Sequence, residues 1–254
     1  MNTDGAFNCI DLFCGCGGLS LGFKEAGYNI IGAIDFNQAA METHKKNFNT
    51  EFEFCGDIAS IEDELIKNQF QNKVDVIIGG PPCQGFSLAG KREENDKRNI
   101  LYTAMVKTAE KLRPKAILLE NVPGMLKLYE GKAKKRIFKD FEELGYTMNV
   151  QVLYAPDFGV PQIRKRAFFV GLLNSNKKFE YPTPYLSEKE YITCEQAISD
   201  LPSLEGDFDY SPNGIRHYTT EPLSEYQKKM RCNSNTIYNH TPTKHAQKTI
   251  DNIS

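Results

Sequence analysis

Short apolar runs, separated by glycine or acidic residues, recur along the first half of the chain. Runs of this kind are typical of strands in a parallel sheet, whose two faces are both buried. They lie at 8–13, 30–34, 52–54, 74–78 and 116–119. Amphipathic stretches predict helices at about 19–26 and 99–112, and another from 132 on that buries Ile137, Phe138, Phe141 and Leu144. The pattern predicts an α/β fold.

The second half of the chain is organised differently. A β-rich portion covers 146–173, where Gln162, Arg164 and Arg166 alternate and are expected on one face of a strand. Three polar side chains on one face require an anionic or polar partner. From 174 on, prolines with Ser, Thr and Asn predict loops and short helices near 195–201 and 224–231. We therefore expect a catalytic domain at 1–173 and a loop-rich extension at 174–254.

Composition narrows the class of protein. The 254 residues are 40% hydrophobic and 25% charged, as in a soluble globular protein, and no stretch approaches the roughly 20 apolar residues of a membrane span. Residues 1–6 lack the features of a secretion signal. Seven cysteines, an odd number, favour reduced thiols and a cytoplasmic location, and no second close pair joins Cys14 and Cys16 in a metal site. The net charge of −2 gives no support for nucleic-acid binding, which would need local basic patches.

The predicted strand ends carry candidate ligand-binding residues. Gly15, Gly17 and Gly18 form a turn after the first strand, Asp35 ends the second, and Asp57 follows the third. In nucleotide-binding folds an acid about twenty positions after the glycine turn binds ribose, and Asp35 has that spacing. The turn reads GxGG rather than GxGxxG, which disfavours NAD and favours S-adenosylmethionine. The simpler alternatives are a glycine turn that only packs a helix and solvated carboxylates.

The segment 79–87, GGPPCQGFS, follows the fourth strand. Two glycines and two prolines fix the backbone and set Cys83 at the carboxyl end of a strand, where ligands bind in open α/β sheets. A lone cysteine is more often a small core residue, but this rigid polar frame favours a reactive thiol. The charged run 91–98 predicts a solvated loop or a lid over the substrate.

Glu120 ends the fifth predicted strand. A carboxylate there, inside a cleft, is expected to be desolvated, which would raise its pKa and let it donate a proton near neutrality. The alternative is a carboxylate that caps a turn or pairs with a lysine.

Four motifs occur in one order: DLFCGCGG at 11–18, PPCQ at 81–84, ENV at 120–122 and QIRKR at 162–166. In this order they resemble the motif series of the cytosine-C5 DNA methyltransferases, over about 8–173 and more weakly to about 250. The resemblance implies a Rossmann-like S-adenosylmethionine-binding sheet with helices on both faces. It also implies the residues that line the cofactor site: Phe13, the glycine turn (Gly15, Gly17, Gly18), Asp35, Asp57, Ile58, Pro82 and Leu101.

The resemblance implies methyl transfer from S-adenosylmethionine to C5 of a cytosine flipped out of double-stranded DNA, most often in bacterial restriction–modification. Cys83 would add to C6 as a thiolate, and Glu120 would protonate or hydrogen-bond N3. Arg164 and Arg166 would hold the base and its flanking phosphate.

The chain departs from the family at its end. The family continues into a target-recognition region and two late motifs that we do not find, so we expect a truncated form, or one subunit that needs a second polypeptide. The chain alone would then methylate little.

Three alternatives predict other features. A tRNA cytosine-C5 methyltransferase shares the chemistry, although Gly85-Phe86-Ser87 favours DNA. A non-catalytic, cofactor-binding regulatory subunit would not need Cys83, Glu120 and both arginines. A nicotinamide oxidoreductase would carry GxGxxG and no Pro-Cys-Gln loop.

Overall fold

The computed structural model describes residues 6–82, 101–204, 214–232 and 234–242. The chain divides into two compact units, a larger one of residues 1–154 and 164–183 and a smaller one of 155–163 and 184–254. Residues 174–183 join the larger unit because they bind along the last two strands of its sheet. Asn149 Nδ2 donates to the Phe179 carbonyl at 2.9 Å, and the Tyr181 hydroxyl donates to the Phe168 carbonyl at 2.7 Å. The functional division expected at 173 stays a prediction.

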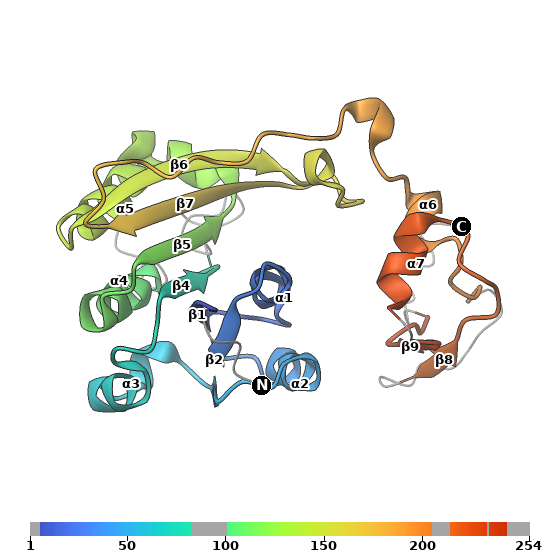
Figure 1. Ribbon diagram of the computed structural model, residues 1–254, viewed down its shortest axis with the longest axis horizontal. Coiled ribbons are helices and arrows are strands. Elements are labelled where there is room, and N and C mark those ends of the chain that lie inside the picture. Colours follow the sequence, from blue (N-terminus) through green and yellow to red (C-terminus); the bar gives the residue numbers. More distant parts are fainter. Residues whose placement is uncertain (1–5, 83–100, 205–213, 233, 243–254) are drawn as a thin grey trace, which may run out of the picture. The chain divides into compact units, whose positions relative to one another are not determined.

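The larger unit is built on a seven-stranded sheet in the order β3-β2-β1-β4-β5-β7-β6. Its strands are β1 (Asn8–Leu12), β2 (Asn29–Asp35), β3 (Phe52–Cys55), β4 (Val76–Gly79), β5 (Ala116–Asn121), β6 (Tyr146–Tyr154) and β7 (Lys165–Leu173). All pairings are parallel except those of β7, which runs antiparallel to both β5 and β6 (Figure 1). The predicted α/β fold is confirmed.

Helices cover both faces of this sheet. They are α1 (Gly18–Glu25), α2 (Gln38–Asn47), α3 (Asp63–Phe70), α4 (Leu101–Leu112) and α5 (Lys132–Glu142), with short 3-10 helices η1 (Ile58–Ser60) and η4 (Pro123–Gly131). Side chains of α3, α4 and α5 share one apolar cluster, while α1 packs on the opposite face through Leu19 and Phe23. The hydrophobic pattern did not predict α2, because this polar helix buries only Met41 and His44.

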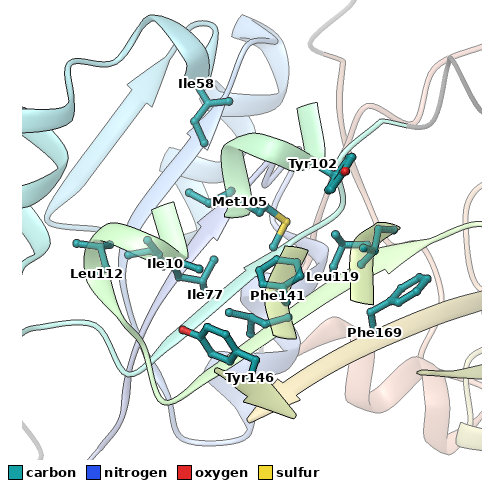
Figure 2. Close-up of a cluster of buried hydrophobic side chains, with 14 of the residues drawn as sticks. Ile10, Ile58, Ile77, Tyr102, Met105, Leu112, Leu119, Phe141, Tyr146 and Phe169 are labelled. Atoms are coloured by element: carbon teal, nitrogen blue, oxygen red, sulfur yellow. The ribbon is translucent and has the colours of Figure 1, made fainter. Parts of the chain in front are cut away.

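The main core fixes the strands that lead to the candidate site. Ile10, Ile77 and Leu119 from β1, β4 and β5 pack with Met105 of α4 and Phe141 of α5, and each is at most 1% exposed (Figure 2). Burial of side chains of this size contributes about 1.5–3 kcal/mol each. This packing therefore holds β4 and β5, and with them their carboxyl ends, firmly in place.

One local prediction is wrong. Since β7 begins at Lys165, Gln162 and Arg164 precede the strand, and the expected row of three polar side chains on one strand face does not form. Pro161 has no N–H to give a sheet ladder, and the Gln162 N–H donates instead to the Val160 carbonyl at 2.8 Å, which closes a tight three-residue turn.

The smaller unit contains little regular structure. Both predicted short helices are confirmed as α6 (Cys194–Ile198) and α7 (Glu225–Arg231); the other elements are η5 (Ala155–Phe158), η6 (Glu188–Glu190), β8 (Ile215–His217) and β9 (Thr236–Tyr238). Buried Gln227 joins the two α-helices by donating to Ser199 Oγ at 3.0 Å, and Arg231 pairs with Asp200 at 2.8 Å. Among the described residues, no helix is long and apolar enough to cross a membrane.

Candidate cofactor and catalytic site

A pocket of about 260 Å³ lies at the carboxyl ends of β1 to β4. Its lining combines apolar side chains, one exposed aromatic ring and two carboxylates: Phe13, Ile34, Asp35, Phe36, Gly56, Asp57, Ile58, Pro82 and Leu101. The structure thus brings together six of the residues expected to bind a cofactor, although they come from five separate segments of the chain.

Asp35 braces the turn beside this pocket. Its Oδ2 accepts the Gly15 N–H at 2.8 Å and its Oδ1 accepts the Asn37 N–H at 2.8 Å. The twenty-residue spacing therefore reflects a direct contact between the glycine turn and the second strand. Phe13, which opens the turn, has φ of 68°, a strained conformation for a non-glycine residue and one often found at functional sites.

Gly17 and Gly18 do not line the pocket. Gly17 has φ of 96°, and a methyl group added to it would overlap the Phe48 ring and lie 3.0 Å from His44 Cδ2. Its role in the structure is to let the turn pack closely on α2. Gly18 is the first residue of α1, and a methyl group there would meet nothing within 4 Å.

Sequence reasoning missed Phe36, which lines the pocket and is 70% exposed. An exposed aromatic ring in the lining of a pocket offers a flat surface for a ligand. Its signal in the sequence is its position directly after the acid that ends β2.

Cys83 and the rest of segment 83–100, including the predicted lid, lie outside the described residues. The structure does describe the residues that lead into this segment. Asn121, 3% exposed, donates from Nδ2 to the Pro81 carbonyl at 3.3 Å. Glu120 Oε2 lies 3.5 Å from the position that a Cβ on Gly80 would occupy. The ends of β4 and β5 are therefore in direct contact where the cysteine segment begins.

Glu120 forms ion pairs with both predicted arginines. Arg166 Nε lies 2.8 Å from Glu120 Oε1, and an Arg164 terminal nitrogen lies 3.3 Å from the same oxygen. The Glu120 side chain is 20% exposed, and the cations that contact it are two arginines rather than the lysine of the simpler alternative. Both of these contacts are made to Oε1, whereas Oε2 lies 3.5 Å from the position of a Cβ on Gly80.

The remaining chemistry of the described residues is limited. No cluster of His, Cys, Asp and Glu among them could hold a metal ion. The six described cysteines are unpaired, and burial raises the pKa of the Cys9 and Cys14 thiols well above the ordinary value.

Comparison with known proteins fits this geometry. The family model for C-5 cytosine-specific DNA methylases matches residues 7–253. The type II methyltransferase M.DdeI of Desulfomicrobium norvegicum is 40% identical over 97% of this chain and 60% of its own length. M.AgeI of Thalassovita gelatinovora is 35% identical over 91% of this chain and 59% of its own length.

Among solved structures, one described as a DNA modification methyltransferase encoded within a prophage (E. coli) superposes with a TM-score of 0.76. It is 29% identical, and the match covers 97% of this chain and 74% of that one. The chain therefore belongs to the C-5 cytosine-specific DNA methylase family. It spans 46–60% of the length of eight curated relatives that it matches.

Proposed function

We propose that the pocket beside the glycine turn binds S-adenosylmethionine. Phe36 and Ile58 offer flat and apolar surfaces suited to an adenine ring, and Asp35 and Asp57 offer carboxylate oxygens suited to hydroxyl or amine donors. Asp57 Oδ1 already accepts the Ala59 N–H, and the carboxylate keeps further lone pairs that can accept from a ligand. The bound cofactor would supply an electrophilic methyl group on a sulfonium.

Replacing Phe36 by alanine tests this site. We expect S-adenosylmethionine affinity, measured by isothermal titration calorimetry, to fall about 5-fold or more, since stacking of a base on an aromatic ring contributes about 1–3 kcal/mol. Because the ring is 70% exposed, the free energy of unfolding should hardly change. Phe7→Ala removes a half-exposed ring that is not part of the pocket lining and serves as the control. Equal affinity in wild type and Phe36→Ala would contradict the proposed site.

We further propose that the whole protein methylates C5 of cytosine in double-stranded DNA. The observation that carries this proposal is Glu120, held by Arg164 and Arg166 at the point where β5 meets the start of the Cys83 segment. Its Oε2 is the atom suited to hydrogen-bond or protonate N3 of a base. The arginines fix the carboxylate through Oε1 and add positive charge for a phosphate.

In this mechanism the Cys83 thiolate adds to C6, and Glu120 at N3 absorbs the charge that develops in the ring. Bound S-adenosylmethionine would supply the methyl group that C5 takes up. A base removes the proton from C5, and the bond between Cys83 and C6 breaks to release the thiolate. Because the target atoms lie inside a duplex, the nucleotide must leave the base stack.

Glu120→Gln tests the catalytic part of the proposal. Transfer of a labelled methyl group should fall about 10²- to 10⁴-fold, the range for loss of a general acid or base, with cofactor affinity unchanged. Glu143→Gln, which alters an exposed carboxylate of an α5 ion pair, should keep wild-type activity. Unchanged transfer by Glu120→Gln would contradict the role of Glu120.

The choice of substrate needs a separate comparison. Relatives named as type II methyltransferases favour DNA within a restriction–modification system. Faster transfer to tRNA than to duplex DNA would replace DNA by RNA as the substrate. Cofactor binding with no transfer to either would favour the regulatory-subunit alternative.

A further inference from the structure

A chain of buried polar side chains lies next to the glycine turn. The proposed methyl-transfer mechanism does not use these side chains. Asp11 of β1, Ser20 of α1 and His44 of α2 are all 0% exposed. Ser20 Oγ lies 2.6 Å from Asp11 Oδ2 and 3.2 Å from His44 Nε2. His44 Nδ1 points to Glu53 of β3, with 3.8 Å to its Oε1. We refer to Asp11, Ser20, His44 and Glu53 as the buried network.

The buried network is in contact with the turn at the cofactor pocket. Gly17 packs on His44 and on Phe48, whose ring stacks on the imidazole at a centroid distance of 4.5 Å. Asp11 lies two residues before Phe13, which lines the pocket. A change in the position of His44 or Asp11 would therefore move the turn, since close-packed interiors transmit small shifts.

Hydrogen-bond directions in the buried network depend on its protons. With Asp11 ionised, Ser20 donates to Asp11 and must accept from His44 Nε2–H, which leaves Nδ1 of the neutral ring bare beside the Glu53 carboxylate. Asp11 Oδ1 and His44 Nδ1 are indeed the buried atoms of the network without a hydrogen-bond partner. A bare acceptor beside a carboxylate is unfavourable.

One added proton removes that conflict. Asp11 can carry it and donate to Ser20, Ser20 then donates to His44 Nε2, and His44 donates from Nδ1 to Glu53. The proton can also reside on His44, with both ring nitrogens donating. The two forms hold the same number of protons, so the buried network takes up its proton as a coupled unit.

We propose that the buried network positions the glycine turn and that uptake of one proton by it weakens cofactor binding. This inference rests on the proposed binding of S-adenosylmethionine, whose sulfonium carries positive charge. A proton taken up behind the turn adds positive charge in a region of low dielectric, where like charges repel strongly. By linkage, the bound cofactor would in turn favour release of that proton.

The surroundings place this proton uptake near neutral pH. Burial raises the pKa of Asp11 to about 7, while the Ser20 hydroxyl opposes that rise and Asp35 adds to it. Burial lowers the pKa of His44, and Glu53 opposes that change. The other titratable groups around the network are the Cys9 and Cys14 thiols and Lys45, which pairs with Glu53 at 3.3 Å. Since the Asp11 carboxyl gains its proton below about pH 7, cofactor affinity should fall as pH drops through that value.

Nitrogen NMR of the full chain with labelled histidine observes the buried network directly. The chain has four histidines, so loss of one signal in His44→Gln assigns His44. As the pH falls and the buried network takes up its proton, we expect the His44 nitrogens to change from Nε2–H to a form protonated at Nδ1. In Asp11→Asn the new amide can donate to Ser20, so Nδ1 should stay protonated throughout. A His44 signal that titrates alike in wild type and Asp11→Asn would overturn the proposal.

Cofactor binding supplies the second measurement. Between pH 8 and pH 6 the wild-type Kd for S-adenosylmethionine should rise about 3- to 10-fold more than that of Asp11→Asn; titration of the ligand itself is common to both. His217→Gln, which changes an exposed histidine of the smaller unit, should behave as wild type. If Asp11 has a purely structural role, Asp11→Asn should raise the Kd by the same factor at every pH. That result would overturn the proposal.

Two outcomes separate this proposal from the proposed function. Absence of S-adenosylmethionine binding at any pH would contradict the function, and the NMR titration would still decide whether the network takes up a proton. If Asp11→Asn does not fold, Ser20→Ala replaces it, because loss of the hydroxyl breaks the link between Asp11 and His44. The pH-dependent change of the His44 nitrogens should then disappear, and its persistence would overturn the proposal.

Discussion

At the residue scale, the two carboxylate oxygens of each acid at a strand end make different contacts. Glu120 uses Oε1 for both arginines and leaves Oε2 toward Gly80. Asp35 uses one oxygen for the Gly15 N–H and the other for the Asn37 N–H while lining the pocket. Each carboxylate oxygen can accept more than one hydrogen bond, so structural contacts leave room for a ligand.

Burial also makes the thiol reactivity of cysteines that are close in sequence differ. Burial beside Asp11 and Asp35 raises the pKa of the Cys14 thiol, whereas Cys16 is exposed. The thiolate is the reactive form, so iodoacetamide should label Cys14 at least about 10-fold more slowly than Cys16 in the folded protein at pH 8. Peptide mass spectrometry gives both rates in one sample, and unfolding in urea should make them equal. Equal labelling in the folded protein would contradict the burial of Cys14.

At the element scale, the site depends on close contact between strands. A methyl group on Gly79 would overlap the Leu12 carbonyl oxygen and lie 3.2 Å from Met105 Sδ, so only glycine lets β4 approach β1 here. This approach fixes the strand end from which the Cys83 segment starts.

Gly79→Ala should therefore lower the free energy of unfolding by about 1–3 kcal/mol, as overpacking of a core does. Gly22→Ala is the matched control, because a methyl group there meets nothing within 4 Å and alanine favours a helix interior by about 0.5–1 kcal/mol. Urea denaturation measures both. A Gly79→Ala protein as stable as wild type would contradict the strand packing.

The sequence predicts the buried elements better than the polar ones. The apolar runs identify the first five strands, because burial on both faces leaves an uninterrupted pattern. The sequence pattern does not predict α2, because this helix is polar apart from one narrow buried stripe. The sequence places Glu120 correctly at the end of a strand and Arg166 within a strand. Their ion pair joins residues far apart in sequence and follows only from the pairing of β5 with β7. The buried network was missed for the same reason, since its members come from four elements.

At the scale of the whole molecule, the net charge of −2 offers no general attraction for DNA, the proposed substrate. Arg164 and Arg166 supply local positive charge at Glu120, the proposed catalytic carboxylate. Phosphate contacts supply much of the affinity of DNA-binding proteins, so a site with two such cations depends on further contacts elsewhere for tight binding.

In the proposed mechanism, Cys83 attacks a cytosine next to Glu120. This attack is tested most directly by covalent trapping on duplex DNA that carries 5-fluorocytosine in many sequence contexts, with S-adenosylmethionine, using the chain alone and with lysate from its source. Fluorine at C5 cannot leave as a proton does, so the bond from sulfur to C6 should persist. We predict an adduct on the peptide that contains Cys83, and none with Cys83→Ser. Cofactor binding without any such adduct, in either condition, would contradict the account.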